Sequence, residues 1–325
     1  DVLDKSVLYM RVFFLGMPVM LLYNFGSAIL RAVGDTKRPL FYLAISGVLN
    51  VILNLIFVLI FDMDVAGVAL ATVLSQGLSA FLIVRCLIKT DGYCKLNLRN
   101  LSIKQDKLLK MIRIGLPAGL QGSIFSISNV LIQSSINSFG SIAMAGNTAS
   151  SNLEGFVYNA MNAIYQTALT FTSQNYGGKQ YARIKKVVCL NVIIVTLVGC
   201  VMGGFVILFG KPLLALYTSE AAAINYGLIR MKIIFSTYFL CGIMDVLVGC
   251  LRGLGRSILP MIVSLLGACG LRVLWIFTIF KAYPALETIY ISYPISWTLT
   301  ATVHLICLLI VMKSLSKKLK ETNTI

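Results

Sequence analysis

The chain of 325 residues carries the sequence LRAVGDTKRP at residues 30–39 and a related sequence, LRGLGRSILP, at residues 251–260. In both stretches a glycine follows a Leu-Arg pair, and a proline stands five residues after that glycine. A glycine after an apolar run ends a helix, and a proline is tolerated in the first turn of the next helix. Each stretch therefore predicts a tight turn between two helices. The residues assigned to these loop motifs are Arg31, Gly34, Pro39, Arg252, Gly255 and Pro260.

Long apolar runs flank both turns and continue along the chain. A membrane-spanning helix needs about 20 apolar residues. Nine runs meet this length, at residues 7–30, 40–61, 65–87, 111–139, 142–173, 184–209, 221–251, 258–280 and 286–312. The sequence therefore predicts an all-α polytopic membrane protein.

The composition excludes other broad classes of protein. Hydrophobic residues make up 58% of the chain and charged residues 12%, whereas soluble domains are about 45–50% apolar and about 25% charged. Too few charged residues are present to cover the surface of a soluble enzyme. The same composition, rich in hydrophobic and poor in charged residues, also excludes a disordered or a fibrous protein. The eight cysteines show no metal or redox spacing, and we interpret them as packing residues.

The basic residues that give the net charge of +16 are distributed as the predicted topology requires. If the nine runs cross the membrane in alternation, 21 of the 28 Lys and Arg residues fall on the side that holds Arg31, Lys37 and Arg38. Basic residues collect on the cytoplasmic side of membrane proteins. This predicts a cytoplasmic C-terminus, and the charge then requires no nucleic-acid partner.

The two turns belong to a longer internal repeat with an offset of 221 residues. The first three apolar runs match the last three in order and orientation, while the middle three have no counterpart. Three further helices are therefore expected before Asp1, which would complete two parallel six-helix halves. The predicted domains are the last three helices of a first lobe (1–88), a cytoplasmic linker (89–110), a six-helix second lobe (111–313) and a basic cytoplasmic tail (314–325).

Five motifs resemble signatures of the multidrug and toxic compound extrusion (MATE) family. The turn at residues 30–39 is similar to a loop of that family. The other four follow in the family's order: GVALATVLSQ at 67–76, IGLP at 114–117, SQNYGG at 173–178 and LRGLG at 251–255. The resemblance implies an exporter of twelve helices in two pseudosymmetric lobes, of which this chain holds the last nine.

The resemblance also implies a function. Members of the family exchange Na+ or H+ for organic, often cationic, compounds, so we expect a multi-pass plasma-membrane antiporter that works by alternating access. No phosphate-binding G-x-x-x-x-G-K-[ST] motif occurs in the chain, which favours an ion gradient over ATP as the energy source. We expect a monomer that binds small organic substrates and the lipid bilayer, with no cofactor, no metal site and no enzymatic activity.

Two acidic residues lie within the predicted spans, Glu154 and Asp245, while the other ten lie in loops or at helix ends. A central acid costs roughly 2.5–3.5 kcal/mol on insertion scales, so such a residue is a functional candidate. Both are assigned to cation coupling. Tyr238 precedes Asp245 by two helical turns and shares its face. The alternative for Asp245 is a structural pair with a buried base such as Arg272.

Glu154 belongs to a polar and aromatic stripe at helical spacing. This face suits a cationic amphipathic ligand through carboxylate and cation–π contacts, although interhelical hydrogen bonding is an alternative. The residues assigned to the substrate cavity are Gln121, Ser128, Asn129, Asn147, Ser151, Tyr158, Tyr165, Tyr238 and Asn24, the last being the repeat counterpart of Asp245.

Sodium-coupled members that resemble this chain carry acids at the positions of Phe125 and about Cys241. Asp245 and Glu154 are candidates to replace that pair, and the alternative is a coupling acid in a helix before Asp1. The lone histidine, His304, is expected to pack rather than to relay protons.

Two other functions remain open. A lipid-linked oligosaccharide flippase of the same superfamily would have a basic cavity, whereas the spans offer two acids against Arg272, which favours cation export. An integral-membrane enzyme would need clustered metal ligands or a Ser/His pair, and a single His304 makes this a poor fit.

Overall fold

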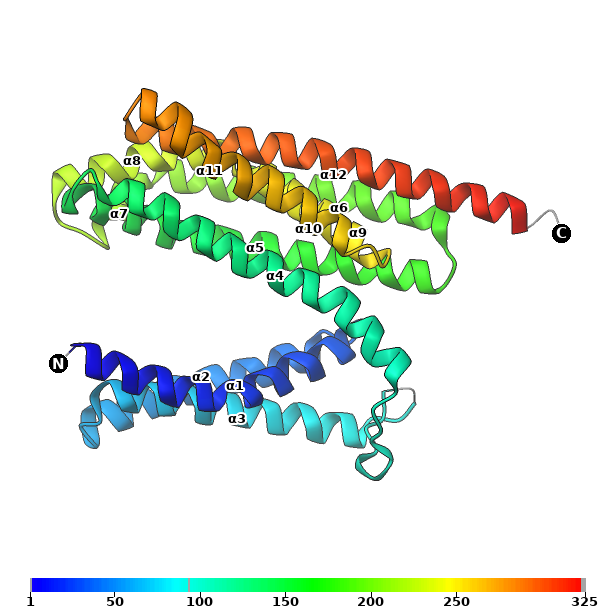
Figure 1. Ribbon diagram of the computed structural model, residues 1–325. Coiled ribbons are helices and arrows are strands. Elements are labelled where there is room, and N and C mark those ends of the chain that lie inside the picture. Colours follow the sequence, from blue (N-terminus) through cyan, green and yellow to red (C-terminus); the bar gives the residue numbers. More distant parts are fainter. Residues whose placement is uncertain (1, 93, 323–325) are drawn as a thin grey trace. The chain divides into compact units, whose positions relative to one another are not determined.

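The computed structural model describes residues 2–92 and 94–322, and the chain divides into two helical units, residues 1–103 and 104–325 (Figure 1). The first unit contains three long helices. They are α1 (Val2–Ala32), α2 (Lys37–Leu55) with a π-helical turn over Ile56–Ile60, and α3 (Asp64–Lys89), followed by a short 3-10 turn (Leu98–Asn100).

The second unit contains the remaining helices. They are α4 (Gln105–Asn137), α5 (Ser141–Gly177), α6 (Tyr181–Leu208), α7 (Gly210–Ala215), α8 (Ala221–Ser236), α9 (Tyr238–Gly253), α10 (Ile258–Ser264), α11 (Leu271–Trp275) and α12 (Leu286–Thr322). Two π-helical turns, Leu265–Gly270 and Ile276–Phe280, join α10 and α11 into one segment and extend it. All the regular structure in the described residues is helical, as the sequence predicts.

The helix bounds differ from the predicted domain bounds at two places. Helix α4 begins inside the predicted linker 89–110, and α12 continues through most of the predicted tail 314–325. Residue 93 of that linker and residues 323–325 of that tail lie outside the described residues. The cytoplasmic location of both segments stays a prediction.

The two sequence turns adopt the same backbone structure, one in each unit. The amide of Gly34 donates to Arg31 O (3.0 Å) and that of Asp35 to Leu30 O (3.0 Å). In the second unit Gly255 donates to Arg252 O (2.8 Å) and Arg256 to Leu251 O (3.0 Å). This pair of bonds is a Schellman motif, which places the glycine in the left-handed region. The glycine φ values are +90° and +76°, so the internal repeat has a physical basis in helix termination.

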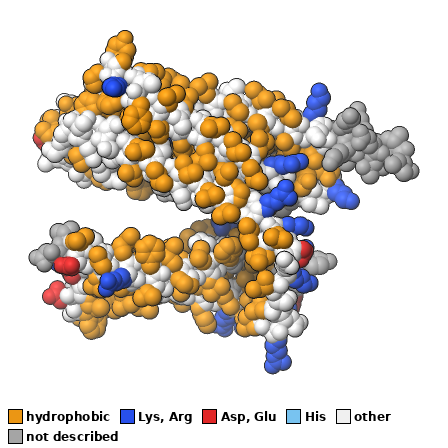
Figure 2. Space-filling model, viewed as in Figure 1, with side chains coloured by type: hydrophobic (Ala, Val, Ile, Leu, Met, Phe, Trp, Pro, Cys, Tyr) orange, Lys and Arg blue, Asp and Glu red, His pale blue; other side chains and the backbone are white. Residues whose placement is uncertain are grey.

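Several helices are long and apolar enough to cross a membrane. Within the described residues six qualify, namely α1, α2 with its π turn, α3, α6, the α10–α11 segment and α12. The pair α8 and α9 makes a seventh if it is one span. Helices α4 and α5 fall short because they carry the polar residues described below. Figure 2 shows apolar side chains covering the visible helix faces, and Leu197, Val201 and Phe205 of α6 are 55–69% exposed, as lipid-facing residues are.

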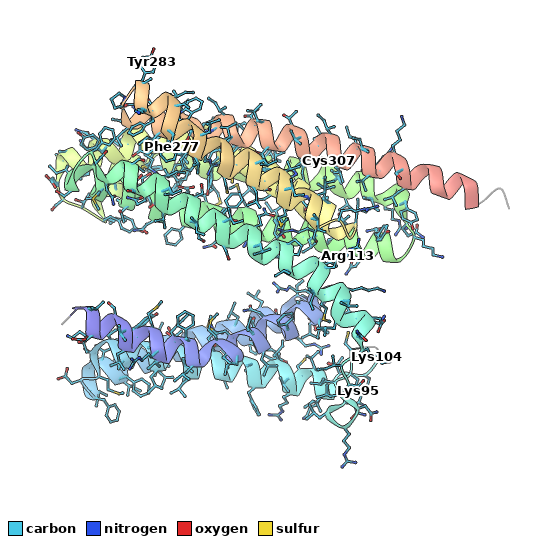
Figure 3. The ribbon with its side chains drawn as sticks, viewed as in Figure 1. Lys95, Lys104, Arg113, Phe277, Tyr283 and Cys307 are labelled. Carbon is cyan, nitrogen blue, oxygen red and sulfur yellow. The ribbon has the colours of Figure 1, made fainter. Side chains whose placement is uncertain are left out.

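Basic side chains of the second unit gather near the end where α4 begins and α12 ends (Figure 2). Lys104 and Arg113 lie at that end, and Tyr283 lies at the opposite one (Figure 3). This asymmetry matches the pattern used to predict the topology.

The predicted span 221–251 is wrong as a single helix, because it breaks at Thr237 into α8 and α9, which are bent by 47°. The hydroxyl of Thr237 donates to the carbonyls of Ile233 (3.1 Å) and Ile234 (3.3 Å). Such bonding from a threonine to the preceding turn competes with the helix ladder and often accompanies a bend.

Helix α9 approaches its neighbours through a glycine seam, which consists of Gly242, Gly249 and Gly253. A Cβ atom at Gly253 would lie 2.9 Å from Leu169 O of α5, and one at Gly249 would lie 3.0 Å from Tyr165 O. Small residues permit this close packing between membrane helices. These close contacts fix the rotation of α9 about its own axis. The face of α9 opposite the glycines therefore borders the cavity described below.

Candidate functional site

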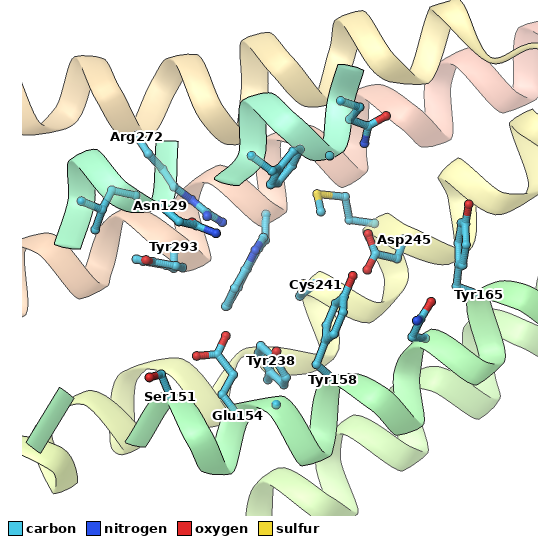
Figure 4. A pocket seen from close by; sticks show the side chains of 18 of the residues that line it. Asn129, Ser151, Glu154, Tyr158, Tyr165, Tyr238, Cys241, Asp245, Arg272 and Tyr293 are labelled. Atoms are coloured by element: carbon cyan, nitrogen blue, oxygen red, sulfur yellow. The ribbon is translucent and has the colours of Figure 1, made fainter. Parts of the chain in front are cut away.

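The second unit encloses a cavity of about 670 Å³ (Figure 4). Six helices contribute to its lining, α4, α5, α8, α9, α11 and α12. Polar and aromatic side chains predominate, which explains why the spans that contribute most, α4 and α5, are less apolar than the rest. The cavity thus combines a membrane location with groups able to bind charge.

Most of the sequence-assigned residues of this unit meet in the cavity. Those that line it are Gln121, Asn129, Asn147, Ser151, Glu154, Tyr158, Tyr165, Tyr238 and Asp245. Ser128 does not line it and is buried, with 4% of its surface exposed. Asn24 lies on α1 of the first unit, where it is exposed. The roles assigned to these residues stay predictions.

Glu154 forms an ion pair with Arg230 of α8. Arg230 is 6% exposed and also donates to Ser150 Oγ of α5 (3.0 Å). A buried base needs such partners, because an unpaired charge in a low-dielectric interior is costly. Glu154 therefore lines the cavity and at the same time holds α8 against α5.

Asp245 has no hydrogen-bonding or ion-pairing partner among the residues that the structure describes. The alternative structural pair with Arg272 does not form, because Arg272 donates to Ser296 instead. Figure 4 shows the Asp245 carboxylate directed into the cavity, on the same side as Cys241 and Tyr158. Asp245 is thus an acid that is free to bind a ligand.

Arg272 is 4% exposed and neither pairs with an acid nor extends outward. Its Nε donates to Ser296 Oγ (2.8 Å). Its guanidinium carbon lies 4.1 Å from the ring centroid of Tyr293 and 5.5 Å from that of Trp297. These aromatic faces stabilise the cation without neutralising it.

Arg252 reaches the cavity although the sequence assigned it only to a turn. Its guanidinium donates to Tyr165 Oη (2.7 Å) on α5 and to Gln121 Oε1 (2.8 Å) on α4. Three helices are joined by this one side chain. A second such link is Asn147, which donates to Gln133 Oε1 (3.0 Å) and accepts from Tyr290 Oη (3.3 Å).

His304 packs in the interior, as expected. It is 0% exposed and its Nε2 lies 3.1 Å from Ser264 Oγ. It does not line the cavity.

The expected charge balance of the cavity is wrong. Two acids line it, but so do three arginines, Arg230, Arg252 and Arg272, rather than Arg272 alone. The sequence did not lead us to expect Arg230 in the cavity, although it lies in the apolar run 221–251. The sequence reasoning also missed the aromatic pair Tyr293 and Trp297, whose spacing of four residues places them on one helix face.

The family model MatE matches residues 1–56 and 117–278. The chain belongs to the MatE family. The match includes the first turn and most of the cavity-lining helices. It confirms the resemblance drawn from the five sequence motifs, and with the apolar helices it indicates a multi-pass plasma-membrane protein of a transporter family, for which small-molecule substrates are expected.

Individual relatives agree with this assignment. "Probable multidrug resistance protein YpnP" of Bacillus subtilis (strain 168) is 30% identical over 81% of this MatE chain and 59% of its own length. "Multidrug export protein MepA" of Staphylococcus saprophyticus is 23% identical over 90% and 68%. A crystal structure described as MATE in complex with MaL6 matches 98% of this chain and 72% of its own, with a TM-score of 0.90 at 21% identity. The chain thus spans about three fifths of the length of YpnP.

Proposed function

We propose that the intact protein is a secondary active multidrug antiporter, which exports organic compounds in exchange for Na+ or H+ by alternating access. The names of the relatives support efflux of small molecules. The observation that carries the coupling is Asp245, a carboxylate that faces the cavity and has no partner among the described residues.

The proposed exchange follows from competition at one carboxylate. Asp245 can hold a proton, a sodium ion or the cationic group of a substrate, but only one of them at a time. Binding of the ion therefore releases the substrate, and binding of the substrate releases the ion. Tyr158 and Tyr165 supply aromatic faces beside this carboxylate for an organic cation (Figure 4).

Glu154 takes a second role in this scheme. Its pair with Arg230 connects α5 to α8, just before the bend at Thr237. A cation that competes for Glu154 would weaken this connection and so favour a different arrangement of the two helices. Differential binding of this kind is what alternating access requires.

The test uses everted membrane vesicles that contain the full-length protein, under separate Na+ and H+ gradients. We expect one gradient to drive accumulation of a cationic dye. Asp245→Asn should abolish this accumulation, whereas Glu287→Gln, which removes an exposed acid outside the cavity, should leave it unchanged. Ion-driven transport that survives both Asp245→Asn and Glu154→Gln would overturn the proposal.

A lipid-linked oligosaccharide flippase of the same superfamily is the second candidate. The three arginines in the cavity favour it, because they suit a pyrophosphate head group. The matching relatives are named as multidrug resistance and export proteins, and they favour efflux. A flippase would move lipid-linked sugar and leave the dye gradient unchanged in the same vesicles.

A further inference from the structure

A smaller cavity, of about 330 Å³, lies in the first unit where α2 begins and α3 ends. Three bases line it, Arg38 of α2 together with Arg85 and Lys89 of α3, and none of the described acids does. The other residues of its lining are Tyr42, Leu82, Cys86 and Thr90. This basic pocket takes no part in the proposed exchange of ion and substrate.

Arg38 is held in position by the turn before α2 and by the end of α3. Its Nε lies 2.7 Å from Asp35 Oδ2, and its Nη1 donates to Thr90 Oγ1 (3.1 Å). The side chain is nevertheless 52% exposed. Arg38 thus supplies the basic pocket with a charge whose direction is fixed in advance.

Arg85 and Lys89 are exposed, and neither has a hydrogen-bonding or ion-pairing partner among the described residues. They lie four residues apart on α3, so their side chains share one face, and like charges at this spacing repel each other. Within the part of the chain that the structure describes, Asp35 is the one acid that pairs with any of the three bases. An anion between Arg85 and Lys89 would offset this repulsion and accept their hydrogen bonds.

The internal repeat separates these bases from the needs of the fold. The three positions that correspond to them at the offset of 221 residues hold Leu259, Ile306 and Ile310. Ile306 and Ile310 are 51% and 63% exposed on α12, so an outward-facing apolar residue is compatible with the helix at both places. A predicted cytoplasmic side calls for bases in general, but not for three of them in one pocket. Their convergence points to a ligand.

The position of the basic pocket indicates the kind of ligand. Both α2, with its π turn, and α3 are long and apolar enough to span a membrane, and the end of such a helix lies near the lipid headgroups. Tyrosine is enriched at this level, and Tyr42 and Leu82 add apolar surface to the lining. Basic pockets between membrane helices bind phosphate-containing headgroups.

We propose that the basic pocket binds the phosphate of an anionic phospholipid. Arg85 and Lys89 donate hydrogen bonds to the phosphate oxygens, while Arg38 contributes its positioned charge. Leu82 and Tyr42 contact the glycerol and the start of the acyl chains. The lipid thereby neutralises a cluster of bases that the protein itself compensates only through Asp35.

The experiment measures binding of phosphatidylglycerol with a fluorescent acyl chain to the purified full-length protein in an uncharged detergent, by fluorescence polarisation. We expect saturable binding that is much tighter than that of phosphatidylcholine with the same chains. Arg85→Gln/Lys89→Gln should weaken phosphatidylglycerol by about thirtyfold, because each base beside an anionic lipid contributes about fivefold. The affinity for phosphatidylcholine should change little.

Three further variants make the test specific. Lys37→Gln removes an exposed base from the first turn of α2, outside the basic pocket, and should leave the affinity unchanged. Arg85→Lys/Lys89→Arg keeps both charges and should retain most of the binding. If the glutamine variant does not fold, Arg85→Ile/Lys89→Ile takes its place, because isoleucine stands at both corresponding positions of the second unit.

Equal affinity of the wild-type protein for the two lipids would overturn the proposal. So would a loss in Lys37→Gln as large as that in the double variant, since this result describes a diffuse charge effect without a pocket. Inorganic phosphate at millimolar concentration should not displace the labelled lipid. Displacement by inorganic phosphate alone would assign the basic pocket to a soluble phosphate compound and contradict a lipid ligand.

Discussion

Arg230 and Glu154 form an ion pair that joins two helices and also borders the cavity. The arginine is almost completely buried and has two oxygen partners on α5, one of which is the carboxylate of Glu154 that also borders the cavity. Without its partner, either residue would be an unpaired charge in a membrane interior, which costs free energy. Any mechanism in which Glu154 exchanges Arg230 for another cation must therefore also compensate the charge of Arg230.

Removal of one member of this pair should destabilise the protein strongly. Arg230→Met leaves Glu154 unpaired, and breaking a buried pair costs about 3–5 kcal/mol. The double variant Arg230→Met/Glu154→Leu should recover much of that loss, because no charge remains buried. Thermal unfolding of the detergent-solubilised protein measures both. A single variant as stable as the wild type would show that the pair is energetically unimportant.

The two turn glycines should respond alike to substitution. No atom lies within 4 Å of a Cβ built at Gly34 or Gly255, so only the positive φ disfavours a side chain there. The left-handed region costs an L-residue about 1–2 kcal/mol, and less for asparagine. We expect Gly255→Ala to lower the melting temperature more than Gly255→Asn does. The reverse order would mean that the turn adopts another conformation in the membrane.

At the scale of helices, α9 depends on its glycine seam. Gly253 leaves no room for a methyl group, since its Cβ would lie 2.8 Å from Thr172 Cβ and 2.9 Å from Leu169 O. Gly253→Ala should therefore destabilise the second unit by about 1–3 kcal/mol through overpacking. Gly204→Ala on α6 is the matched control, because nothing lies within 4 Å of its Cβ. Chemical denaturation should show a loss for the first variant and none for the second.

The helices were largely predictable, and their breaks were not. Apolar length and the Gly and Pro signals of the two repeated turns located the long helices, because both depend on local chemistry. The bend at Thr237 has no signature of its own, because Thr167, Thr196 and Thr302 make the same hydroxyl-to-carbonyl bond within unbroken helices. A local pattern does not distinguish these cases.

The cavity residues on a single helix could be predicted from the sequence, but the contacts between helices could not. The polar stripe from Asn147 to Tyr165 emerged from helical spacing alone. The partners of that stripe did not, because Glu154 and Arg230 are separated by 76 residues, and Arg252 and Gln121 by 131. Pairing across such distances depends on which helices become neighbours. The error in the cavity's charge balance has the same origin.

At the scale of the whole molecule, the distribution of bases predicts the orientation in the membrane. A green fluorescent protein fused after Ile325 should fluoresce, because it folds in the cytoplasm, and alkaline phosphatase fused at the same residue should be inactive. The comparison of the two fusions in intact cells measures this directly. An active phosphatase fusion would place the C-terminus outside and reverse the predicted topology.

The glycine seam has a consequence for how this protein can change over evolutionary time. One face of α9 is fixed by backbone contacts and tolerates almost no variation. The opposite face, which includes Cys241 and Met244, borders the cavity. Substitutions that keep side-chain size on the second face can therefore alter the cavity lining while the glycine contacts stay in place. The lining of the cavity can thus change one residue at a time, while the contacts that position α9 are retained.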